Sequence, residues 1–136
     1  MNEPFVKEKV MTYLSKQLAY TITGYKEQGR HGPDIEARKN DWDFIIEAKG
    51  DPDPEGKSSR EVYFLQCLGQ IVTRMDRLKA ARYGIAFPES YKDLLIRRVP
   101  WKACQRLSLH LFLVNKDGIV AELDYRAVRA LQKSNY

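Results

Sequence analysis

The stretch HGPDIEARKNDWDFIIEAKGD, residues 31–51, decides how this chain folds. It holds two strand-like runs, PDIEAR and WDFIIEAK, joined by the polar residues Lys39, Asn40 and Asp41. Two such runs around a tight polar turn are typical of a β-hairpin. The stretch therefore predicts two antiparallel strands, and these strands carry charged residues where Val or Ile would be ordinary.

The charged residues of this hairpin are predicted to share one site. Side chains alternate between the two faces of a strand, so Glu47 and Lys49 lie on the same face as Ile45. The opposite face takes Trp42, Phe44, Ile46 and Ala48. Asp34 begins the first strand, and a tight turn near Asn40 places it across from the end that carries Glu47 and Lys49. Two carboxylates and one ammonium group are expected to converge.

This grouping of charges suits the hydrolysis of phosphodiester bonds. Carboxylate oxygens are hard ligands for Mg²⁺, which takes only one or two carboxylates from a protein and keeps several waters. A bound metal acidifies water and neutralises charge on a phosphate under attack. A neighbouring lysine can orient or deprotonate the water and stabilise the developing oxyanion.

The sequence before the hairpin predicts a helix and a strand. Apolar residues recur every fourth position from Val6 to Leu18, after Asn2 as a possible N-cap and Pro4 in the first turn. The run YTITGY, residues 20–25, is rich in β-branched and aromatic residues, so it predicts a strand. The first three strands therefore form a meander.

A loop and a long helix follow the hairpin. The segment GDPDPEGKSS, residues 50–59, is a loop by its Gly, Pro and Ser content, and Ser58 with Glu61 forms a capping-box pattern. Gly69 would let another backbone come close to this helix. Its expected apolar positions include Val62, Leu65, Leu68, Val72, Met75 and Leu78.

The remaining sequence completes an α/β domain. YGIAF, residues 83–87, predicts a strand buried on both faces, and residues 89–99 a helix that stops before Pro100. Residues 101–107 are expected to form a short turn, and residues 107–123 a strand, a turn and a strand. The segment DYRAVRALQ, residues 124–132, predicts a terminal helix. The fold class is a central mixed sheet flanked by helices.

The motifs GPDIEAR and DFIIEAKGD resemble the paired motif of the PD-(D/E)xK nuclease superfamily. This superfamily has the restriction-endonuclease-like fold and includes Holliday junction resolvases and Mrr-type and RecB-type nucleases. The predicted order of helix, three-strand meander, helix and strand is also similar to its common core, over about residues 1–87. The resemblance implies that Asp34 and Glu47 bind Mg²⁺ or Mn²⁺, that the backbone carbonyl of Ala48 completes the metal shell, and that Lys49 is the catalytic lysine.

The resemblance to the superfamily also implies two site residues on the predicted helices. Many members have a glutamate on the first helix near the metal. Glu8 matches it by distance to the first strand, whereas Glu3 has the better helical phase; Glu8 is preferred here, with a solvated surface glutamate as the alternative. Related families also place a glutamine on the helix after the triplet, which implies Gln66, with Gln70 where tyrosine often follows. The residues expected to contact nucleic acid are Gln70, Arg74, Arg77 and His31.

Composition sets the broad class of the protein. The 136 residues predict a single domain, 1–136, and 43% hydrophobic with 30% charged residues predict a globular chain. Cys67 and Cys104 are expected to be buried free thiols, because neither lies in a CxxC pair or near a His cluster. No secretory or membrane-spanning segment is evident, so a soluble, cytoplasmic protein is expected. The formal net charge of +5 suits a polyanionic partner.

Several alternatives stay open at the level of sequence. Asp34, Glu47 and Lys49 are either a catalytic set or a surface salt-bridge set. The chain is either a metal-dependent DNA nuclease or a catalytically inactive subunit that binds nucleic acid or assembles with other proteins. The DNA is ordinary, branched or otherwise structured. A homodimer is expected, with an interface on residues 107–114 and 119–123 or with those residues as an ordinary extension of the sheet. The segment RRVPWK, residues 97–102, either contacts nucleic acid through Trp101 or is a helix end that packs over it.

Overall fold

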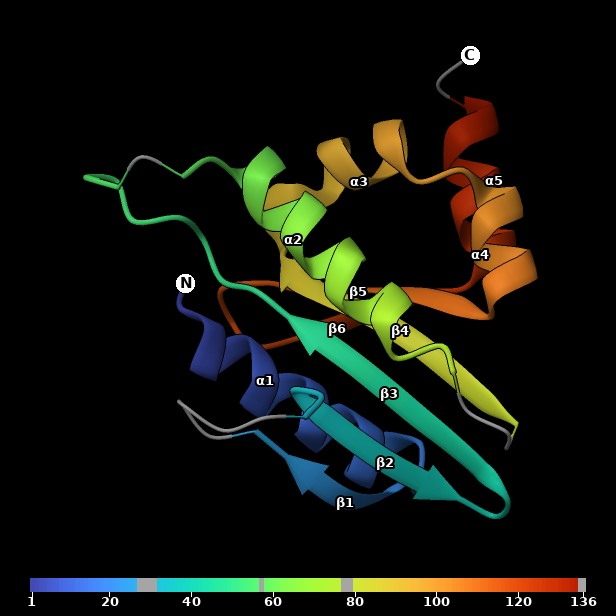
Figure 1. Cartoon of the computed structure of the whole chain (residues 1–136). Coiled ribbons are helices and arrows are strands. Elements are labelled where there is room, and N and C mark those ends of the chain that lie inside the picture. The colour runs from blue at the N-terminus through green and yellow to red at the C-terminus, as the bar shows by residue number, and fades with distance from the viewer. Residues whose placement is uncertain (27–31, 57, 77–79, 135–136) are drawn as a thin grey trace.

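A computed structural model describes residues 1–26, 32–56, 58–76 and 80–134. A six-stranded mixed sheet forms its centre, and helices cover both faces (Figure 1). The strands are β1 (Thr21–Tyr25), β2 (Ile35–Lys39), β3 (Trp42–Ala48), β4 (Ala81–Pro88), β5 (Leu109–Val114) and β6 (Val120–Leu123). The helices are α1 (Glu3–Thr12), α2 (Arg60–Thr73), α3 (Lys92–Arg98), α4 (Trp101–Leu107) and α5 (Tyr125–Ser134). The predicted α/β class with a mixed, helix-flanked sheet is confirmed.

The predicted meander forms the first half of the sheet. β1, β2 and β3 pair in antiparallel order, and the β2–β3 hairpin runs in register from Ile35 opposite Ile46 to Lys39 opposite Trp42. The two-residue turn between the strands places Asn40 at a φ of +55°. Asparagine tolerates this left-handed conformation better than most residues, so the sequence fits the turn and the turn fixes the register.

The second half of the sheet is mostly parallel. β3, β4 and β5 run parallel, with α2 crossing from β3 to β4 and with α3 and α4 crossing from β4 to β5. β6 returns antiparallel to β5. Residues 83–88 of β4 are all buried, as the continuous apolar run predicts. The strand order follows the chain order from β1 to β6.

Two cores lie on opposite faces of the sheet. Under α1, the core contains Val6, Val10, Leu14, Phe44, Ile46 and Phe112, among other residues. Under α2 to α5, it contains Ile45, Phe64, Cys67, Ile71, Leu95, Cys104 and Val128, among others. Ile45 and its neighbours Phe44 and Ile46 thus face opposite layers, as the alternation along β3 predicts. Both cysteines are free and buried, which confirms that prediction.

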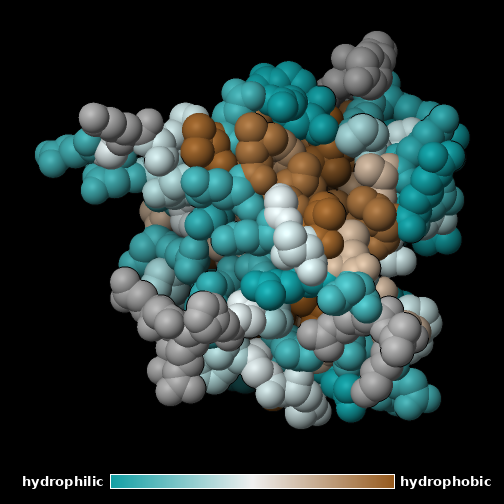
Figure 2. Space-filling model, viewed as in Figure 1, coloured by the Kyte–Doolittle hydropathy of each residue, from teal (hydrophilic) through white to brown (hydrophobic). Residues whose placement is uncertain are grey.

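The N-cap predicted for α2 is wrong by one residue, and of the predicted apolar positions that the structure describes only Leu68 and Met75 pack against the core. The side chain of Ser59, rather than Ser58, accepts the N–H of Val62 at 3.2 Å. The core takes Phe64, Cys67 and Ile71. Val62, Leu65 and Val72 are instead 41%, 48% and 51% exposed. Figure 2 shows apolar side chains gathered on the surface over this helix; Leu78 lies outside the described residues.

In the C-terminal half, the prediction for residues 101–107 is wrong and the prediction for residues 107–123 is confirmed. Residues 101–107 form the helix α4, not a turn, and Pro100 directly precedes it. Residues 107–123 supply β5 and β6, and all six residues of β5 except His110 are buried. Of the two alternatives for this segment, the structure shows the extension of the sheet. Within the described residues, no helix is long and apolar enough to cross a membrane.

Candidate functional site

The two acids of the hairpin lie together at the end of β3. The β2–β3 register pairs Ile35 with Ile46, so the next residues along, Asp34 and Glu47, oppose each other. Asp34 is 4% exposed and Glu47 is 1% exposed. The backbone N–H of Ala48 donates to Asp34 Oδ2 at 2.8 Å, which holds this carboxylate against β3. The convergence predicted from the hairpin pattern is present in the fold.

The surroundings of Glu47 disfavour its charged form. Burial raises its pKa most, and a hydrogen bond with Asp34 and the negative charge of Asp34 raise it further, to about 7. Hydrogen bonding and charge from Arg74 oppose this rise. Two buried carboxyl groups in contact need either a shared proton or a cation to offset their repulsion. The site is therefore built to hold positive charge.

Arg74 supplies part of that charge from the end of α2. Its Nε lies 3.0 Å from Glu47 Oε1, and its Nη2 donates to the carbonyl of Gly32 at 3.0 Å. Lys26 Nζ lies 4.0 Å from Asp34 Oδ1 on the other side of the pair. The sequence predicts that Arg74 contacts nucleic acid; in the structure its guanidinium lies on the acidic pair. One guanidinium thus joins α2, β3 and the loop before β2.

Lys49 directly follows β3, on the face that carries Glu47. Its backbone N–H donates to the carbonyl of Ala86 at 3.0 Å, which continues the pairing with β4 by one residue. Its Nζ lies 5.4 Å from the centre of the Tyr63 ring on α2. A cation over an aromatic ring is attracted to it, so Tyr63 holds the ammonium group beside α2. No short-range sequence pattern predicts this role for Tyr63, because it depends on the packing of α2 against the end of β3.

The structure places Glu3, rather than Glu8, toward the site. Glu8 is 67% exposed and pairs with Lys9 at 3.8 Å, which agrees with the alternative of a solvated surface glutamate. Burial raises the pKa of Glu3 most, the charge of Asp34 raises it further, and Lys49 opposes the rise. These interactions couple the start of α1 to the acidic pair.

Gly50 is the reason that α1 can start so close to the site. A Cβ at Gly50 would lie 2.5 Å from the backbone nitrogen of Glu3, a distance that real contacts do not reach. The N–H of Asp51 donates to the carbonyl of Met1 at 2.8 Å, and Tyr91 Oη donates to the carbonyl of Gly50 at 2.8 Å. Gly50, the residue after Lys49, thus packs directly against the backbone at the start of α1.

The other predicted site residues are placed less closely. Gln66 and Gln70 are exposed on α2, and no described hydrogen bond joins either to Asp34, Glu47 or Lys49. His31 and Arg77 lie outside the described residues.

The backbone carbonyl of Ala48 faces Asp34. The N–H and the carbonyl of one strand residue point to the same side of the strand, and the Ala48 N–H donates to Asp34.

The donor set fits a hard divalent cation that keeps its waters. No three His, Cys, Asp or Glu side chains in the described ranges cluster closely enough to hold a metal alone. Two carboxylates and the Ala48 carbonyl offer only oxygen ligands, which Mg²⁺ and Mn²⁺ prefer. Mg²⁺ normally takes one or two protein carboxylates, so a full protein cage is not required.

Comparison with known proteins supports the fold. No family model matches the chain, and no curated protein matches its sequence. The fdxN element excision controlling factor protein from Anabaena variabilis is 18% identical, with a TM-score of 0.58 over 87% of this chain and 96% of that chain. An XisH family protein from Nostoc punctiforme PCC 73102 is 16% identical, with a TM-score of 0.57 over 86% and 96%. At these identities the likeness shows the fold alone, which is restriction-endonuclease-like.

Proposed function

We propose that the chain is a Mg²⁺- or Mn²⁺-dependent nuclease that hydrolyses phosphodiester bonds in DNA. The observation that carries this proposal is the buried contact between Asp34 and Glu47, with Lys49 two residues further on the same face. A merely structural ion pair needs only opposite charges, whereas this site sets a second buried carboxyl group, Asp34, against the one that Arg74 already pairs. The restriction-endonuclease-like fold is consistent with this chemistry.

Each residue has a distinct part in the proposed reaction. Asp34, Glu47 and the Ala48 carbonyl would hold the cation, and the Ala48 N–H keeps Asp34 in position. The bound cation would supply a more acidic water and offset the charge of the scissile phosphate. Lys49 then orients the attacking water and stabilises the charge that develops on the phosphate. Tyr63 positions Lys49 for this role.

A second function is favoured by one observation. Arg74 already neutralises Glu47, which suits a protein that keeps the fold and binds nucleic acid or assembles with other proteins without turnover. One structural neighbour is described as an excision controlling factor, which names a control function. In that case the chain would bind DNA, and neither divalent metal nor Lys49 would affect the binding.

Cleavage of a plasmid with and without Mn²⁺ separates these functions when the acids are varied one at a time. We expect Asp34→Ala and Glu47→Gln each to abolish cutting and to weaken Mn²⁺ binding measured by calorimetry. Glu55→Gln is the matched control, because Glu55 begins a second Glu-x-Lys triplet in an exposed loop. Unchanged cutting in either acid variant, with the fold intact by circular dichroism, would contradict the assignment.

Lys49→Ala separates chemistry from binding. Loss of a preorganised charge in the transition state should lower the single-turnover rate about a hundredfold or more. DNA affinity should fall far less, because one phosphate contact among several reduces the salt slope by only about one unit. Loss of affinity in proportion to loss of rate would refute the catalytic role of Lys49.

A homodimer is part of the same proposal. A domain of this size carries one site, and cutting both strands of a duplex needs two sites related by a two-fold axis. The exposed apolar line on α2, defined by Val62, Leu65, Gly69 and Val72, is the surface proposed for self-association. A Cβ at Gly69 would meet nothing within 4 Å, so this line is open to a second helix.

A further inference from the structure

The cationic excess of the chain is concentrated on two helices away from the acidic pair. The sequences of α4 and α5 contain no Asp or Glu. Their basic residues are Lys102, Arg106, Arg126, Arg129 and Lys133. Removing these five from the 23 basic residues of the chain leaves 18, which equals its 18 acidic residues. The rest of the chain therefore has as many basic as acidic residues, and these two helices carry an unbalanced excess of cations.

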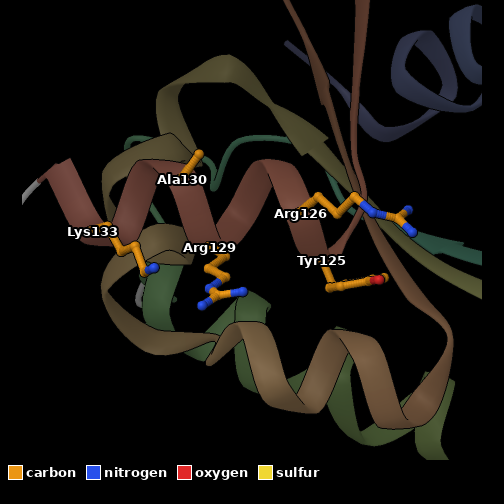
Figure 3. Close-up of a pocket in the computed structure, with 5 residues that line it drawn as sticks. All are labelled: Tyr125, Arg126, Arg129, Ala130 and Lys133. Atoms are coloured by element: carbon orange, nitrogen blue, oxygen red, sulfur yellow. The ribbon is translucent and has the colours of Figure 1, made fainter.

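The cations of α5 share one exposed side of the helix. Arg126, Arg129 and Lys133 are all exposed, and the buried side of the helix is defined by Val128 and Gln132. With Tyr125 and Ala130, the three cations line a hollow of about 440 Å³ (Figure 3). Figure 3 shows Arg129 and Lys133 leaving the helix on the same side. At 1.5 Å per residue, Arg126 to Lys133 spans about 10 Å.

Aromatic rings help to order three of the five cations of α4 and α5. Arg129 Cζ lies 4.7 Å from the centre of the Trp101 ring, and Lys102 Nζ lies 5.9 Å from the same ring. Arg126 Cζ lies 4.7 Å from the centre of the Tyr125 ring. A guanidinium that stacks on a ring keeps its N–H edges free for another partner. Because the rings already order these donors, binding a partner costs less side-chain conformational entropy.

A buried glutamine makes this surface rigid. Gln132 is 8% exposed, and its Nε2 donates to the carbonyls of Ile96 and Val99 at 3.0 and 2.6 Å. Its Oε1 accepts the N–H of Trp101 at 3.1 Å. These bonds tie α5 to the segment between α3 and α4. The position of Trp101, and with it the position of Arg129, is thus fixed by the fold.

The nearest acid does not neutralise the surface. Asp124 accepts the N–H of Ala127 at 2.9 Å, so its side chain caps the start of α5. It also lies 3.8 Å from Arg126, which is 74% exposed. An ion pair this long and this exposed contributes little to stability. Arg129 and Lys133 have no carboxylate within salt-bridge distance among the described residues.

We infer that α4 and α5 form a phosphate-binding surface for the DNA backbone, separate from the proposed cleavage site. Each strand of a duplex presents a phosphate about every 3.4 Å of axis, so a 10 Å row of cations spans about three of them. A membrane would need a row of exposed apolar residues beside the cations, whereas the apolar side of α5 is buried and Leu107 is the one large apolar residue of α4 that is exposed. The inference rests on the proposed function only for the choice of DNA as the polyanion.

Charge-matched triple variants test this surface. The test variant combines Arg126→Gln, Arg129→Gln and Lys133→Gln. The control variant combines Lys16→Gln, Lys39→Gln and Lys116→Gln, which replace exposed cations outside α4 and α5. Binding of a fluorescent duplex is measured in EDTA from 50 to 300 mM salt, so that no metal-dependent cleavage occurs. We expect the α5 triple to bind at least tenfold more weakly at 0.1 M salt and to lower the salt slope by about two to three units. The control should change the affinity by less than threefold.

The possible outcomes are distinct from those of the cleavage test. Equal losses in the two triple variants would show that only net charge matters, and would overturn the inference. Unchanged DNA binding in the α5 triple, with lost binding to phosphatidylserine vesicles or polyglutamate, would also overturn it and would identify a different partner. Because the measurement needs no turnover, a protein without nuclease activity can still confirm the surface.

Discussion

Arg74 donates to Glu47 across 3.0 Å and so occupies one oxygen of a carboxylate that is 1% exposed. The two residues are 27 positions apart and come from different elements, α2 and β3. The same guanidinium also binds the Gly32 carbonyl. Arg74 therefore stabilises the acidic pair in the absence of a metal, and it competes with any metal that binds Glu47.

Arg74→Gln should reveal that competition. Without metal, the variant leaves Asp34 and Glu47 in contact with no guanidinium, so the free energy of unfolding should fall by about 1.5–3 kcal/mol. Mn²⁺ should then bind more tightly and raise the thermal midpoint by more than it does in the parent. Arg97→Gln, at an exposed position of α3, is the control. A smaller Mn²⁺-induced shift in Arg74→Gln would contradict the competition.

Glu3 and Glu8 form a matched pair of variants on α1. Glu3 interacts with Asp34 and Lys49, whereas Glu8 is exposed and pairs with Lys9. Glu3→Gln should therefore change the Mn²⁺ affinity and the rate of DNA cleavage by several fold, and Glu8→Gln should change neither. Calorimetry with Mn²⁺ and single-turnover cleavage measure the two effects. The reverse pattern would restore Glu8 as the helix residue of the site.

Gly50→Ala should disturb the start of α1. The added Cβ would lie 2.5 Å from the nitrogen of Glu3, and backbone cannot easily yield, so a loss of about 1–3 kcal/mol is expected. Gly69→Ala is the opposite case, because its Cβ meets nothing within 4 Å on an exposed helix; it should stabilise by up to about 1 kcal/mol. Urea unfolding measures both, and equal effects would show that the contact at Gly50 relaxes freely.

Glu122, which lies outside the acidic pair, should also make the free energy of unfolding depend on pH. Burial alone would raise its pKa, but hydrogen bonds from His110 and Tyr13, each 2.7 Å long, lower it below 4.5. A lowered pKa stabilises the fold above the unfolded value, and this contribution is lost as the pH falls through the folded value. Glu122→Gln should therefore be less stable by about 1–3 kcal/mol at pH 7, and this difference should shrink as the pH falls below 4.5.

Thermal unfolding from pH 3 to pH 7 measures this difference, with Glu89→Gln at an exposed position as the control. A difference that stays constant across the range would mean that lost packing, and not the charge of Glu122, explains the effect.

Leu65→Glu should prevent self-association if α2 forms the dimer interface. Leu65 is 48% exposed on the apolar line of α2, and a charge there would have to be buried in a dimer. Ile119→Glu is the control, because Ile119 is 66% exposed at the other edge of the sheet, just before β6. Light scattering should show a dimer for the parent and the control and a monomer for Leu65→Glu. A monomeric parent at micromolar concentration would count against the dimer.

The hairpin could be predicted because its determinants are local. The alternation of faces along β3 and the two-residue turn at Asn40 fix the register, and the register alone brings Asp34 to Glu47. The partner of Glu47 could not be predicted in this way. Arg74 reaches it only through the packing of α2 on the sheet, and no short-range pattern encodes that distance.

The errors on the helices also have physical causes. α2 carries two apolar lines, Val62–Leu65–Val72 and Phe64–Cys67–Ile71, and periodicity alone does not say which one the sheet covers. α4 has only seven residues, too few for a periodic pattern to separate a helix from a turn. Adjacent serines before α2 both satisfy the capping rule, so the cap could be placed only to within one residue.

The match between strand order and chain order has a consequence for folding during synthesis. Each strand pairs with the one made just before it, so the β2–β3 hairpin can close before α2 has left the ribosome. At that moment Asp34 and Glu47 face each other while Arg74 is still unavailable. The two carboxylates are then open to water, where their repulsion is weak, and it becomes costly only when α2 packs against the sheet. Arg74 thus arrives with the same helix that buries the charges it offsets.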